Sequence, residues 1–141
     1  MVTVAASPTI SYDIPDTWWT FCDLDKWKPT TEFYLAKELN DNNVTVIPIA
    51  DIQPITRDLG NGSPFRKYKL VPILLRFQSP TEPWLPPIEV ELITGAEPYK
   101  YKLTNGFHRF VASIVVGYRS IPTKITFPNP KTSFLYPFRN T

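Results

Sequence analysis

The chain has 141 residues, a length that suits one domain with a sizeable core rather than two. Hydrophobic residues make up 43% of it and charged residues 20%, which excludes a disordered tail. The net charge of +2 is too small for charge attraction alone to bring the protein to nucleic acid, so we expect no nucleic-acid partner.

Cysteine content and hydropathy bear on the cellular compartment. The single cysteine, Cys22, cannot form an internal disulfide, and no Cys or His cluster has the spacing of a zinc site. No stretch approaches the ~18 apolar residues of a transmembrane helix, and the first residues lack the pattern of a signal peptide. We therefore expect a cytoplasmic protein with no membrane contact and no metal held directly by its side chains.

Residues 1–43 are predicted to form an extended arm that is rich in proline and aromatic residues. Prolines interrupt it repeatedly, and a short helix is predicted only over residues 30–41. The arm is too apolar to remain in solvent, so it should pack on the core or on a second copy of the chain. The apolar character of the arm comes mainly from four aromatic residues: Trp18, Trp19, Phe21 and Trp27.

Residues 44–127 are predicted to form a compact domain of mixed α/β (α+β) class. Alternating apolar residues predict strands over 43–52, 88–93 and 120–127, and a further strand follows the Gly95 turn. A helical pattern covers 63–77, where Pro72 predicts a kink or two short helices. The clearest helix spans 106–116. Residues 128–141 carry four more large apolar side chains and are predicted to dock as a tail.

The junction between the third strand and the last helix is the first candidate site. Gly106 permits a close approach to the backbone, and a helix start offers N–H groups and the positive end of its dipole to an anion. Arg109 adds a forked cation and His108 a second donor, which together suit a phosphate. The same pattern also fits a plain packing role, with an exposed arginine and a histidine satisfied within the fold.

Several short motifs occur in a familiar order. They are "IPIADIQP", "LPPIEVELI", "YKYKLTNGFHRF" and "IPTKI". Together they resemble the ParB/sulfiredoxin superfamily, and the likeness is closer to sulfiredoxin. The resemblance covers residues 44–127, and it implies the fold predicted above.

The resemblance also implies a ligand, ATP or another nucleotide, together with Mg²⁺. In the family, the His-Arg pair at the helix start holds phosphates, which here implicates Gly106, His108, Arg109 and Asn105. An upstream basic helix holds the rest of the nucleotide. In this chain that helix would be the one that contains Ser63, Arg66, Lys67 and Lys69, and the two lysines are competing candidates for the role.

Two departures from the family pattern argue against sulfinic acid reduction. Phe107 stands where sulfiredoxins carry the reactive cysteine, and Gln53 stands where they carry the arginine that stabilises its thiolate. Other chemistry needs a base. Thr56 lies where kinase-like members carry a carboxylate, although Asp58 lies two residues further on. If the protein is an enzyme, His108 and Asp58 are therefore the catalytic candidates.

Three functions stay open from the sequence. The first is a nucleotide-dependent phosphotransferase or hydrolase. The second is a non-catalytic module that binds a small molecule or a protein, with Phe107 filling the former thiol position. The third is a ParB-like DNA-binding or nuclease protein, which the nearly neutral charge argues against.

Overall fold

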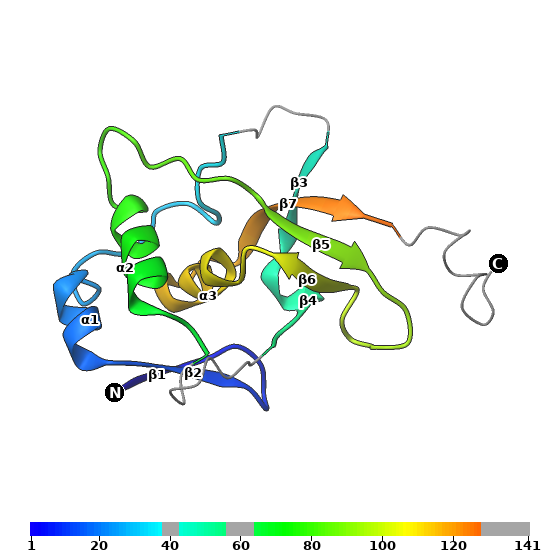
Figure 1. Cartoon of the computed structure of the whole chain (residues 1–141), viewed down its shortest axis with the longest axis horizontal. Coiled ribbons are helices and arrows are strands. Elements are labelled where there is room, and N and C mark those ends of the chain that lie inside the picture. The colour runs from blue at the N-terminus through cyan, green and yellow to red at the C-terminus, as the bar shows by residue number, and fades with distance from the viewer. Residues whose placement is uncertain (38–42, 56–63, 128–141) are drawn as a thin grey trace.

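The structure is a computed structural model and describes residues 1–37, 43–55 and 64–127. Its main feature is a mixed sheet of five strands in the order β3-β7-β5-β6-β4 (Figure 1). Two neighbouring pairs are parallel, β5 with β7 and β4 with β6, and the other two are antiparallel. The strands are β3 (Val44–Pro48), β4 (Ile52–Gln53), β5 (Ile88–Leu92), β6 (Tyr101–Asn105) and β7 (Ser120–Thr126).

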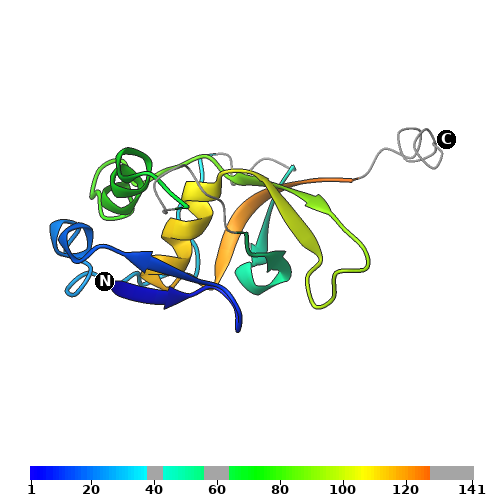
Figure 2. The ribbon, with the colours of Figure 1, turned by 60° about the horizontal axis from the view of Figure 1, so that its bottom comes forward.

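Helices cover one side of this sheet. Helix α3 (Phe107–Val116) packs between the sheet and α2 (Lys67–Arg76), which lies beside α1 (Asp16–Phe21) at the far end of the molecule (Figure 1). A separate hairpin of β1 (Val2–Ala5) and β2 (Ser11–Ile14) runs past α3 (Figure 2). The class is therefore mixed α+β, as the sequence predicts.

Helix α3 is the centre of the core. Eight of its ten residues are buried, and Gly117 ends the helix in the left-handed conformation. The N-terminal arm adds to the same core, which confirms that it packs on the domain. Its fully buried contributors are Tyr12, Ile14, Cys22, Leu24 and Tyr34. Burial raises the pKa of the Cys22 thiol, as expected for a small core residue.

The predicted helix over residues 30–41 is wrong across its described part. The backbone of Leu35 and Lys37 pairs with Leu85, and Ala36 forms a bridge to the same residue. The Tyr34 hydroxyl donates to the carbonyl of Pro86 at 2.6 Å. Pairing with a segment about fifty residues away therefore overrides the local helical pattern.

Three further expectations need correction. The predicted strand over 43–52 divides into β3, a 3-10 turn (η1, Ile49–Asp51) and β4. The arm contains a hairpin and a helix rather than extended chain alone. Residues 67–76 form one helix despite Pro72. Pro72 has no N–H to donate to the carbonyl of Tyr68 one turn earlier. Both residues are exposed, so water can donate to that carbonyl instead.

The predicted order β-α-β-β-α-β is otherwise confirmed between β3 and β7. The division at residues 43 and 127 stays a prediction, and the docking tail, residues 128–141, lies outside the described residues. None of the helices in the described ranges has both the length and the apolar character needed to span a bilayer.

Candidate functional site

The turn from β6 into α3 depends on glycine. Gly106 has φ 98° and ψ 32°, a left-handed conformation that other residues rarely adopt. A Cβ atom at this position would lie 2.9 Å from Ile88 Cγ2 and 3.1 Å from Arg109 Nη2. The turn therefore needs a residue without a side chain, and the glycine brings the start of α3 close against β5.

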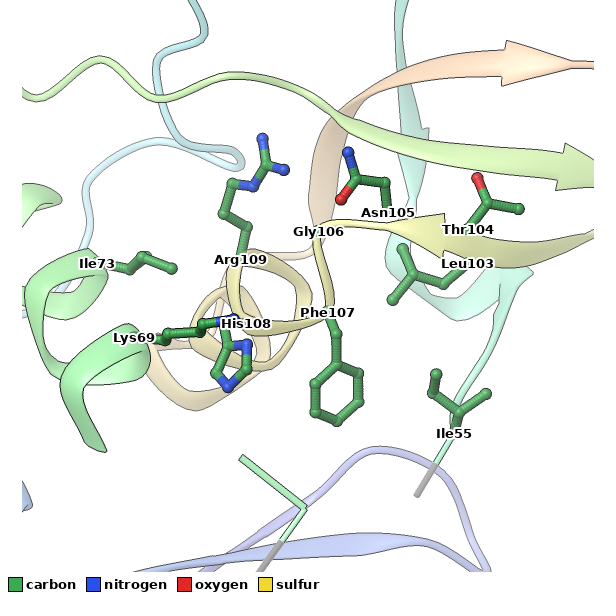
Figure 3. Close-up of a pocket in the computed structure, with 10 residues that line it drawn as sticks. All are labelled: Ile55, Lys69, Ile73, Leu103, Thr104, Asn105, Gly106, Phe107, His108 and Arg109. Carbon is green, nitrogen blue, oxygen red and sulfur yellow. The ribbon is translucent and has the colours of Figure 1, made fainter. Parts of the chain in front are cut away.

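A pocket of about 440 Å³ opens at this turn (Figure 3). Its wall is built from β6, the first turn of α3, the middle of α2, and Ile55, which follows β4. Two cations, Lys69 and Arg109, belong to the wall, and neither has a carboxylate partner among the described residues. The described lining residues are Ile55, Lys69, Ile73, Leu103, Thr104, Asn105, Gly106, Phe107, His108 and Arg109.

His108 is tied to the start of the neighbouring helix. Its Nε2 atom accepts a hydrogen bond of 3.0 Å from the backbone N–H of Arg66, the residue that precedes α2. Such an acceptor carries no proton on Nε2, so in this arrangement the ring is neutral. The bond satisfies an N–H that has no partner within α2. This hydrogen bond supports the packing interpretation of His108, although the residue also lines the pocket.

Arg109 is half-buried, and like His108 it both lines the pocket and forms hydrogen bonds to another segment of the protein. Its Nη1 atom donates to the carbonyls of Pro86 and Pro87 at 2.9 and 2.8 Å. The guanidinium therefore holds the double-proline segment before β5 rather than extending freely into solvent. No other guanidinium N–H of Arg109 has a hydrogen bond to a described residue, so those donors remain for a ligand.

The structure distinguishes the two lysines that compete for the ligand-binding role. Lys69 lines the pocket and extends from α2 toward the first turn of α3 (Figure 3), whereas Lys67 is not among the lining residues. Asn105 also lines the pocket, but its amide nitrogen donates to the Glu89 carboxylate at 3.1 Å. Asp58, the other catalytic candidate, and Ser63, at the start of the expected basic helix, lie outside the described residues.

Tyr12 supports the pocket from the N-terminal hairpin, and no motif in the sequence points to it. Its hydroxyl donates to the carbonyl of Ile55 at 2.8 Å, and its ring packs edge-on against Phe107 and Phe65. Burial raises the pKa of this hydroxyl to about 12, so it stays a donor at ordinary pH. Trp18, also from the N-terminal arm, packs edge-on against Phe65.

The arrangement suits an anion held beside an apolar surface. The described part of the lining holds no Asp or Glu, and the described residues contain no group of three potential metal-ligating side chains. The positive end of α3 adds to the two cations, because the Gly106 cap offers no side-chain acceptor to the first turn. A multiply charged anion would fit this charge pattern.

Comparisons with known proteins give one distant likeness. No family model matches the chain, and no curated protein matches it. Among solved structures, the C-terminally truncated chromosome-partitioning protein ParB from Caulobacter crescentus, complexed with CTP-γ-S, is similar with a TM-score of 0.45 and 19% identity. The likeness covers 61% of this chain and 45% of that one. The nucleotide analogue in that complex is bound by ParB.

Proposed function

We propose that the protein binds a nucleotide in the pocket beside Gly106, with the phosphates at the start of α3. The observation that carries the proposal is the pair of cations, Lys69 and Arg109, on a wall without a carboxylate among its described residues. A phosphate chain supplies the missing negative charge. It also accepts hydrogen bonds from backbone N–H groups at a helix start.

The apolar part of the wall favours a nucleotide over free phosphate. Ile55, Ile73, Leu103 and Phe107 give the pocket a surface on which a base or ribose can rest. The volume of about 440 Å³ lies in the range of small-molecule pockets. ATP with Mg²⁺ is the ligand we expect from the motif resemblance, and CTP and ADP belong to the same class.

Catalysis is a separate question from binding. Phosphotransfer or hydrolysis needs a base near the acceptor, and Asp58 remains the candidate for that role. His108 is the second candidate. It would have to release the N–H of Arg66 before its Nε2 atom took a proton. Sulfinic acid reduction is not proposed, because Phe107 and Gln53 replace the residues that it needs.

The test is calorimetric titration of ATP, ADP and CTP with Mg²⁺, on the wild type and on two lysine variants. Lys69→Ala removes a charge from the pocket wall. Lys67→Ala removes the same charge from the same helix outside that wall. A charge-assisted contact of an exposed lysine is worth about 1–2 kcal/mol. Lys69→Ala should therefore weaken binding by about 5- to 30-fold, and Lys67→Ala should leave it unchanged.

Two outcomes would overturn the proposal. One is the absence of binding by the wild type at millimolar nucleotide. The other is an equal loss of affinity in both variants, which would indicate charge attraction without a site. Analysis of released phosphate in the same samples then separates an enzyme from a binding module.

A further inference from the structure

A second pocket lies between the N-terminal arm and the end of α2. Its volume is about 300 Å³. Its walls carry four aromatic rings: Trp27 and Tyr34 from the arm, Phe77 after α2, and Tyr118 after α3. Tyr34 stacks on Phe77 with centroids 5.6 Å apart, and Phe77 meets Tyr118 edge-on at 5.3 Å. Tyr34, Phe77 and Tyr118 thus pack against one another, so this part of the aromatic wall is preformed.

The pocket differs from the first in its charge. No charged side chain belongs to its described lining, and its polar groups are an amide and hydroxyls. Burial raises the pKa of both Tyr34 and Tyr118, so their hydroxyls remain neutral. A charged ligand would lose its hydration here without gaining a partner of opposite charge. An uncharged ligand is the better match.

Gln78 supplies a fixed acceptor on the wall. Its Nε2 atom donates to the carbonyl of Cys22 at 2.6 Å and to that of Leu74 at 3.3 Å. Two carbonyl partners require the NH₂ group at that end, which fixes the orientation of the amide. The Oε1 atom accepts no hydrogen bond from the described residues. It is therefore an acceptor held in place beside the aromatic rings.

We propose that this second pocket binds a small, uncharged aromatic molecule that carries an N–H or O–H donor. The aromatic rings would contact the faces and edges of the ligand, and Gln78 Oε1 would accept its donor. A volume of about 300 Å³ holds a one- or two-ring compound. The site is separate from the nucleotide pocket, since the two share none of their described lining residues.

The probe is indole, with benzofuran as a control of the same shape that lacks the N–H donor. Calorimetry or NMR titration of the wild type should give an indole dissociation constant on the order of 1 mM, as suits a ligand of this size. Benzofuran should bind about 3- to 10-fold more weakly, because it leaves the glutamine acceptor unpaired. Equal binding of the two compounds would refute the role of Gln78.

The location is tested in the wild type and in two variants. Indole should shift the amide signals of residues 27–35 and 77–79 and leave those of 106–109 unchanged. Thr30→Trp places a large ring at an exposed lining position and should abolish binding. Thr81→Trp makes the same change at an exposed residue outside the lining and should not. Shifts confined to other residues, or full binding by a folded Thr30→Trp protein, would overturn the proposal.

Discussion

The Gly106 turn offers a stability test with an internal control. Gly106→Ala and Gly117→Ala place the same methyl group at the two ends of α3, where φ is 98° and 94°. An L-residue in the left-handed region costs about 1–2 kcal/mol, and this cost is common to both variants. Only Gly106 meets neighbouring atoms, because nothing lies within 4 Å of a Cβ at Gly117.

The difference between the two variants comes from the contact with Ile88. The Cβ of an alanine at residue 106 would lie 2.9 Å from Ile88 Cγ2, and Ile88 is fully buried. Overpacking of this kind adds about 1–3 kcal/mol. We therefore expect Gly106→Ala to lower the free energy of unfolding by about 2–5 kcal/mol, and Gly117→Ala by about 1–2 kcal/mol.

Urea unfolding followed by tryptophan fluorescence measures both values under the same conditions. The slope of the transition should stay the same, so that the midpoints report stability alone. Equal losses in the two variants would refute the argument, because they would show that backbone strain is the whole effect and that the start of α3 is not pressed against β5.

Three further results are expected. Because burial raises the folded-state pKa of Tyr12 from 10.0 to about 12, the free energy of unfolding should be fully retained below pH 10 and fall between pH 10 and 12; a flat profile by urea titration would contradict this. Tyr34→Phe and Arg109→Ala should cost more together than the sum of their single effects, because either single variant leaves the Pro86 carbonyl one of its two donors and only the double variant removes both; strict additivity in a double-mutant cycle would argue against that shared acceptor. The protein should not reduce a sulfinylated peroxiredoxin with ATP, since Phe107 and Gln53 replace the required groups, and measurable turnover would overturn this reading.

The parts of the fold that the sequence predicts correctly are those set by local pattern. Helix α3 has apolar residues at helical spacing and a glycine at each end, so its limits follow from short-range rules. Strand β5 alternates apolar and acidic residues over its five positions, which is enough for the period to show. The Gly106 turn was likewise visible, because only glycine suits a left-handed junction there.

The parts that the sequence misses depend on distant partners. Strand β2 has only four residues, so the alternation that buries Tyr12 and Ile14 is too short to stand out. Residues 34–37 carry a helical pattern, yet pairing with Leu85 decides their conformation. No local rule reports a partner that lies about fifty residues away.

The same limit applies to the candidate site. Gly106, His108 and Arg109 can be grouped from the sequence because they are neighbours in it. Lys67 and Lys69 stay in competition at that level, because the sequence does not show which side of their helix faces the pocket. The bonds from Arg109 to the double proline, and from the backbone of Arg66 to His108, join segments that lie more than twenty residues apart. Both give a packing role to side chains that the motif alone assigns to a ligand.

Backbone NMR offers the most direct test of the central claim that phosphates bind at the start of α3. ATP with Mg²⁺ should shift the amide signals of residues 106–109 in a saturable manner, and triphosphate without a nucleoside should shift the same signals at higher concentration. Adenosine without phosphate should leave them nearly unchanged, because a neutral ligand has no charge to place against Lys69 and Arg109. Saturable shifts that avoid residues 106–109, or equal shifts with adenosine and ATP, would contradict the account.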